Sequence, residues 1–127
     1  MAAQRKGLGL VHVNHVVYPV SSLAASVPFY RDFLGIKEIP KMVPNENIVW
    51  LQLPSKVMVH LIEHKNVPAP DPVHIAFEVE DLDAAEKGLL EHKIAIENKG
   101  VRKDGQRYVF FRDPDGNRVE LCTPSGF

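Results

Sequence analysis

The sequence is poor in cysteine, in long hydrophobic runs and in charge of one sign. Its single cysteine, Cys122, can form neither an intrachain disulfide nor a zinc site made of several cysteines. The 15 basic and 16 acidic residues give a net charge of -1 and form no single-sign block suited to nucleic acid or an anionic membrane. We therefore expect a reducing compartment, and any bound metal must be held by histidine and carboxylate side chains.

No segment approaches the roughly 18 consecutive apolar residues of a membrane-spanning helix. Residues 1–10 contain Arg5 and Lys6, but they lack the apolar core and small-residue cleavage site of a signal peptide. A chain of 127 residues, 45% hydrophobic and 24% charged, has the length and composition of one globular domain. These features predict a cytoplasmic, single-domain protein (residues 1–127) that binds neither membrane nor nucleic acid.

The chain contains an internal repeat that spans nearly its whole length. Shifted by 59 residues, the extended segment around His15 falls on the segment around His74. Shifted by 60 residues, the apolar segment around His60 falls on the one around Glu120, and one inserted loop residue accounts for the difference. Because the similar features follow the same order in both halves, we expect two modules built on one plan.

Each module is predicted to contain a strand, a helix and three further strands. In module one, about residues 10–63, these elements are expected at residues 11–20, 22–34, 36–43, 47–53 and 56–63. In module two, about residues 73–122, they are expected at residues 73–79, 81–93, 94–101, 107–112 and 117–122. The connector, residues 64–72, is expected to be stiff and extended because it holds three prolines.

The first helix carries capping signals and one breaking signal. Ser21 or Ser22 is the expected N-cap and Gly35 the expected stop. Pro28 lies beyond the first turn, so it predicts either a kink or a regular helix that begins later, near residues 25–26.

Three successive strands after each helix predict an α+β fold with antiparallel or mixed sheets and helices on one side. A four-stranded sheet of this kind leaves its other face unburied. We therefore expect two such sheets to pair around a shared cleft, either within one chain or between two chains.

Four candidate metal ligands occupy equivalent positions in the repeat. His15 and His74 lie on the first strand of each module, and His60 and Glu120 lie on the last strand. Strand alternation directs His60 and Glu120 away from the apolar residues that flank them, and so toward the cleft. Imidazole and carboxylate together suit Zn, Ni, Fe(II), Mn or Co. A surface or hydrogen-bonded role is the alternative at each position, but the repeat symmetry favours a metal site.

No site role is predicted for several other conspicuous residues. We expect solvent-exposed positions for His12, His64, His92, Arg102, Lys103 and Arg107. We expect buried, apolar surroundings for Trp50, Phe110, Phe111 and Cys122.

Several segments resemble the vicinal oxygen chelate superfamily, which contains glyoxalase I, fosfomycin-resistance proteins, methylmalonyl-CoA epimerase, extradiol dioxygenases and bleomycin-binding proteins. The resemblance is carried by residues 13–16, 22–26, 29–35, 73–77 and 111–121. It implies two βαβββ modules that pair into a partly closed sheet, assembly as a homodimer, and one divalent metal ion in the cleft. The family's ligand positions fall on His15, His60, His74 and Glu120.

The function that the resemblance implies is a metal-dependent, glyoxalase-like lyase or isomerase. Its small substrate would be chelated through vicinal oxygens, with Glu120 as the catalytic group that moves a proton. Glyoxalase I typically has Glu where this chain has His60, which departs from that pattern. An extradiol-type dioxygenase and a thiol transferase are alternatives on the same site, since both activities occur in members that use His15, His74 and Glu120. A metal-free dimer that binds a small molecule, as in bleomycin resistance, is the other alternative.

Overall fold

The computed structural model describes residues 7–127, so Arg5 and Lys6 lie outside the described residues. Module one contains β1 (His15–Val20), α1 (Leu23–Val27), the π-helical segment η1 (Pro28–Phe33), β2 (Lys37–Ile39), β3 (Ile48–Gln52) and β4 (Met58–Glu63). Module two contains β5 (His74–Glu78), α2 (Leu82–Glu91), β6 (Asn98–Val101), β7 (Arg107–Arg112) and β8 (Arg118–Cys122). No helix within residues 7–127 is long and apolar enough to cross a membrane.

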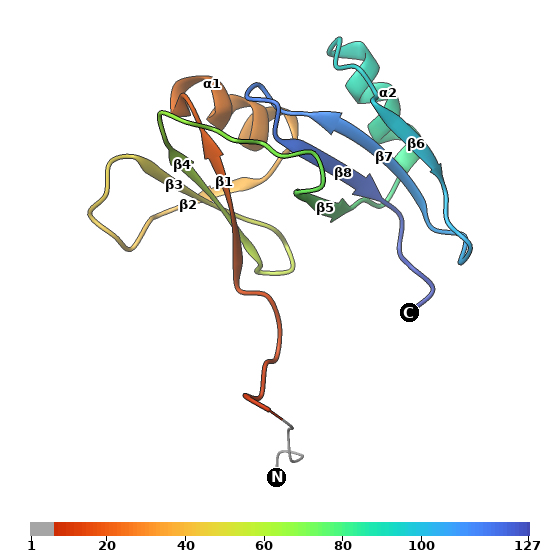
Figure 1. Cartoon of the computed structure of the whole chain (residues 1–127), viewed down its shortest axis with the longest axis horizontal. Helices are drawn as coiled ribbons and strands as arrows, with labels where there is room; N and C mark the ends of the chain where they lie inside the picture. The colour runs from red at the N-terminus through yellow and green to blue at the C-terminus, as the bar shows by residue number, and fades with distance from the viewer. Residues whose placement is uncertain (1–6) are drawn as a thin grey trace.

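The two modules form two four-stranded mixed sheets of the same topology. Strand order is β1-β4-β3-β2 in sheet one and β5-β8-β7-β6 in sheet two. The first and last strands of each module pair in parallel, and the remaining pairs are antiparallel. The sheets lie side by side and stay open (Figure 1). The predicted α+β class and the predicted repeat are confirmed.

The first helix changes type at its proline. The Ser22 hydroxyl accepts a hydrogen bond from the backbone N–H of Ala25, so the helix begins at Leu23 and the later start is wrong. From Pro28 onward the chain forms the wider turns of η1, because proline has no N–H to donate and its ring disfavours a regular α-helix. Gly35, at φ +82°, ends the segment as predicted.

Three strands are shorter than predicted, each for a different reason. His15 lies opposite Met58, the first residue of β4, so residues 11–14 have no neighbouring strand and extend away from the sheets (Figure 1). Strand β2 stops before Pro40, which cannot donate to a ladder. Strand β6 begins only at Asn98, opposite Phe110, because the apolar residues before it pack into the core instead.

One face of each sheet forms the core. Val59 and Leu61 of β4 and Val119 and Leu121 of β8 are buried there, as predicted. The modules are joined by the hydroxyl of Tyr18, which donates to the carbonyl of Arg118 at 2.7 Å and accepts from the N–H of Ile75 at 2.9 Å. Burial raises the pKa of Tyr18, so this hydroxyl keeps its proton.

Candidate metal centre

Sheet one holds a stack of three aromatic rings on the face away from the core. Trp50 of β3 lies opposite His60 of β4, and their rings stack at 4.5 Å between centroids with 4° between planes. The ring of His15, at the start of β1, stacks on His60 at 4.3 Å and 17°. Because β4 lies between β1 and β3, the His60 ring is sandwiched between the other two. We call Trp50, His60 and His15 the three-ring stack.

The ring nitrogens of the three-ring stack differ in whether they have a hydrogen-bond partner. His15 Nδ1 lies 2.8 Å from Asn14 Oδ1, an arrangement in which Nδ1 donates and Nε2 keeps a free lone pair. His60 is only 6% exposed, and its Nε2 and the Trp50 Nε1 have no hydrogen-bond partner among the described residues. Burial, and then the proximity of His15, lower the pKa of His60, so the ring is neutral at neutral pH.

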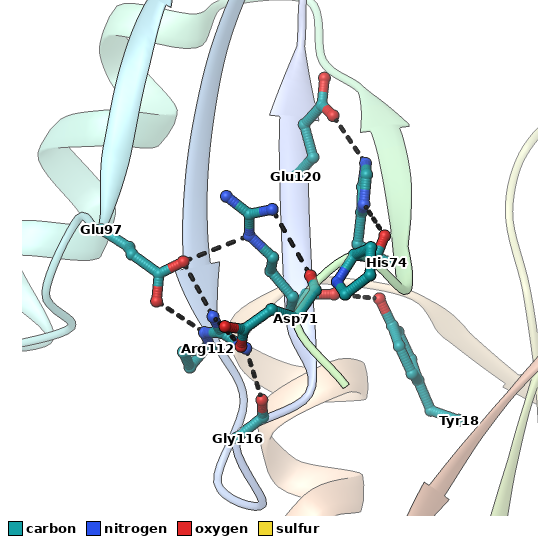
Figure 2. A network of polar contacts seen from close by, with 9 residues as sticks. Tyr18, Asp71, His74, Glu97, Arg112, Gly116 and Glu120 are labelled. Atoms are coloured by element: carbon teal, nitrogen blue, oxygen red, sulfur yellow. Dashed lines mark hydrogen bonds and ion pairs between the residues drawn. The ribbon is translucent and has the colours of Figure 1, made fainter. Parts of the chain in front are cut away.

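Sheet two holds a second pair, His74 of β5 and Glu120 of β8 (Figure 2). Glu120 is 3% exposed; its Oε1 lies 3.0 Å from His74 Nε2, and its Oε2 accepts from Arg102 Nη1 at 3.1 Å. His74 Nδ1 lies 3.0 Å from the carbonyl oxygen of Pro72, which can only accept, so Nδ1 is protonated. If the imidazole is neutral, Nε2 is unprotonated, and its lone pair faces a carboxylate oxygen of Glu120.

Two acceptors that face one another repel unless a proton or a cation lies between them. The 3.0 Å separation is also that of two ligand atoms bound at about 2.1 Å with an angle near 90°. An imidazole oriented by a backbone carbonyl through its other nitrogen is the usual support of a metal-bound histidine. His74 and Glu120 therefore fit a divalent cation in both chemistry and spacing.

Arg102, predicted to be solvated, contacts the site. Its guanidinium lies 4.2 Å above the Tyr108 ring and donates to Gln106 Oε1 as well as to Glu120. Arg102 follows β6 in a turn that folds back over sheet two, and no periodic pattern marks such a position. Arg107, by contrast, pairs with Asp83 on α2, and Lys103 is exposed, as predicted.

Two of the residues expected to be buried border the candidate site. Trp50 and Phe110 lie directly opposite His60 and Glu120. Phe110 is buried, as predicted, whereas Trp50 is only half-buried. Strand alternation in β3 and β7, read together with the repeat, could have placed them beside the site. Phe111 is a core residue as predicted, and Cys122 is buried, which raises the pKa of its thiol. His12, His64 and His92 are exposed as predicted.

The four predicted ligands form two separate pairs. His15 contacts His60 on sheet one, and His74 contacts Glu120 on sheet two. Within residues 7–127 there is no group of three or more His, Cys, Asp or Glu side chains that could together hold a metal ion. Within one chain, each site therefore contains only two of the four predicted metal ligands.

Comparison with known proteins places the chain in a family. The glyoxalase/bleomycin resistance protein/dioxygenase superfamily profile matches residues 12–121. The metallothiol transferase FosB of Staphylococcus haemolyticus is 32% identical over 120 residues, which cover 89% of this chain and 84% of FosB. YaeR of Escherichia coli is 32% identical over 125 residues, covering 90% of this chain and 97% of YaeR.

The fold agrees with the sequence comparison. A glyoxalase/dioxygenase from Nostoc punctiforme superposes with a TM-score of 0.77 and 26% identity, covering 97% of each chain. The chain belongs to the glyoxalase/bleomycin resistance protein/dioxygenase superfamily, also called the vicinal oxygen chelate superfamily.

Proposed function

We propose that this protein is a divalent-metal-dependent enzyme of the glyoxalase type, a lyase or isomerase. Its substrate is a small molecule with two neighbouring oxygens that bind the cation. The observation that carries the proposal is the pair of facing acceptors on sheet two, His74 Nε2 and Oε1 of the buried Glu120, which lie 3.0 Å apart and need a cation or a proton between them.

The proposed ligands are His15, His74 and Glu120. Two imidazoles and one carboxylate suit Zn, Ni, Fe(II), Mn or Co and leave coordination positions for substrate oxygens. When bound, the cation supplies Lewis-acid polarisation of those oxygens. His60 stands outside this set because its ring is sandwiched between two others.

The chain's own residues prepare the site for proton transfer. Asn14 and the Pro72 carbonyl each accept from a histidine Nδ1, which fixes the ring of His15 and that of His74 and, in the neutral form of each ring, leaves a lone pair on Nε2. Arg102 holds Glu120 Oε2 and so sets the orientation of the carboxylate. Glu120 is the group we assign to moving a proton to or from the substrate carbon.

The proposal includes a homodimer in which His15 of one copy joins His74 and Glu120 of the other. Its support is that the two pairs stay apart within the described part of one chain, one pair on each sheet. Members of the superfamily commonly form dimers, and a dimer brings sheet one of each copy to sheet two of its partner.

The activity is tested with the reconstituted enzyme on hemithioacetals of 2-oxoaldehydes, with Glu120→Gln as the informative variant. We expect Glu120→Gln to abolish turnover, even at metal concentrations that saturate the remaining ligands. Lys103→Ala, an exposed neighbour of Arg102, serves as the control and should retain full turnover. Full activity in Glu120→Gln would remove the proton-transfer role.

Thiol transfer is a second candidate, and the similarity to FosB favours it. In this reaction a thiol sulfur attacks a carbon of a small electrophile such as an epoxide, the C–O bond breaks, and the released oxygen takes a proton. Incubation of the reconstituted enzyme with a low-molecular-weight thiol and an epoxide, followed by mass spectrometry, separates the two candidates. A thioether adduct, formed only with metal, would favour transfer, whereas turnover of the hemithioacetal alone would favour the lyase or isomerase.

A further inference from the structure

We infer that His60 is a positioning residue for His15 and not a metal ligand, with Trp50 as the support on its other face. The inference rests on the proposed metal site and concerns the position where the repeat places a fourth ligand. It starts from the three-ring stack on sheet one, which the parallel pairing of β1 with β4 and the antiparallel pairing of β3 with β4 bring together.

The geometry of the two rings shows that His15 and His60 cannot both be ligands of one metal ion. The lone pair of an imidazole nitrogen lies in the plane of the ring, so a bound ion lies close to that plane. The planes of His15 and His60 differ by 17° and are stacked at 4.3 Å between centroids. Planes stacked in this way do not meet near the rings, so a single ion cannot lie in both. As long as the stack persists, only one of the two histidines can be a ligand.

His15 is the one with its nitrogen prepared for a ligand. Its Nδ1 has the acceptor Asn14 Oδ1 at 2.8 Å, and its side chain is exposed at the start of the strand. The buried Nε2 of His60 has no hydrogen-bond partner among the described residues, and the ring is held by contacts on both faces. The contacts of His60 are thus those of a flat aromatic platform.

Stacking on His60 restricts the side chain of the exposed His15. A free His15 ring would sample several rotamers, and ordering it when the cation binds would cost conformational entropy. Stacking on the buried His60, which itself lies between two rings, fixes the plane of the ring beforehand. Trp50 makes the platform rigid, since its ring lies within 4° of parallel to that of His60.

The test compares His60→Phe, which keeps a flat ring but has no nitrogen, with His60→Ala, which removes the ring. Affinity for Zn and Co(II) is measured by competition with a chelating dye. We expect His60→Ala to weaken binding by about 10- to 100-fold, the usual effect of removing a group that orients a ligand, and His60→Phe to stay within about threefold of wild type. His64→Ala, an exposed histidine of the connector, is the control and should bind as wild type does.

A second readout uses the metal-free protein, so that it does not depend on the metal site. Ring currents from the stack should shift the carbon-bound protons of the His15 ring upfield in NMR spectra of wild type and His60→Phe. In His60→Ala these signals should move to the positions of an exposed histidine. This result would support the stack even if the wild type bound no metal and the proposed function failed.

Two outcomes overturn the inference. Equal loss of affinity in His60→Phe and His60→Ala would make His60 a ligand. Identical His15 signals and identical affinities in all three proteins would show that the stack does not position His15.

Discussion

Glu120 could be predicted to face the site, but its contact with Arg102 could not be predicted from the sequence. The alternation of β8 is enough to predict that Glu120 faces away from the core, and the repeat matches it with His60. Nothing in the sequence linked Arg102 to Glu120, because the contact depends on how the turn after β6 folds. Residues on strands could therefore be predicted from periodicity, whereas residues in turns could not.

The Arg102–Glu120 contact predicts a change in stability. Arg102→Ala leaves the buried Glu120 carboxylate without its cationic partner, so we expect the metal-free protein to lose about 1–3 kcal/mol of unfolding free energy. Urea unfolding measures this loss. Lys103→Ala should change the value by no more than about 0.5 kcal/mol. Equal values for the two variants would mean that Arg102 does not stabilise Glu120.

The residues that begin or end the helices could be recognised in the sequence. Ser22, Asp81 and Gly35 cap or stop helices at the predicted positions. The strand boundaries were less predictable, since a strand such as β1 ends where its partner ends and not where its own β-branched residues end. That limit depends on pairing across the sheet, which a local pattern does not contain.

Gly35 and Gly88 give a matched pair of predictions. Gly35 has φ +82°, so Gly35→Ala should destabilise the protein by about 1 kcal/mol through backbone strain alone, because its added methyl group meets no atom within 4 Å. Gly88 lies in α2 with equally open space, so Gly88→Ala should stabilise it by about 0.5–1 kcal/mol. Thermal or urea unfolding of both variants checks the signs. Two effects of the same sign would contradict this account of the helix end.

A network of charged side chains ties the connector to sheet two. Glu97 accepts from Arg112 at 2.7 and 3.0 Å and from Arg118 at 3.2 Å, and Arg112 also reaches Asp71 of the connector (Figure 2). Hydrogen bonds from Arg112 hold the pKa of Glu97 below its ordinary value of 4.5. The network therefore contributes stability above about pH 4.5, and the contribution is lost as the pH falls through the lowered pKa.

Glu97→Gln tests this contribution. At pH 7 we expect it to cost about 1 kcal/mol, the upper range for a half-exposed pair with two-point Arg–carboxylate geometry. The difference from wild type should shrink as the pH is lowered below 4.5, because the wild-type carboxyl is then protonated as well. Thermal unfolding from pH 3 to pH 7 gives the comparison. A difference that grew toward low pH would have the wrong sign for this network.

At the scale of the whole molecule, the repeat predicted the fold better than the site. It gave two modules of the same topology and placed the ligand candidates at equivalent positions. It did not determine how the modules sit together. Contacts such as the Tyr18 hydroxyl between β1, β5 and β8 decide that arrangement, and they leave the two ligand pairs apart.

The proposed dimer predicts that two defective chains can restore a site. His15→Ala and His74→Ala should each lose the complete ligand set. If the subunits of the two variants are exchanged at equal amounts, half of the dimers are mixed, and each mixed dimer has one intact site of two. We expect about a quarter of the wild-type metal capacity to return. No recovery after verified exchange would mean that the site, if present, forms within one chain.

The central claim is that this chain binds one divalent cation through His15, His74 and Glu120. The most direct test is the metal content per chain after anaerobic reconstitution with Zn, Ni, Mn and Fe(II) in turn, for wild type and His74→Ala. The account predicts close to one equivalent per wild-type chain for at least one metal, and its loss in the variant. No bound metal under any of these conditions would contradict the account and favour a metal-free dimer that binds a small molecule in its cleft.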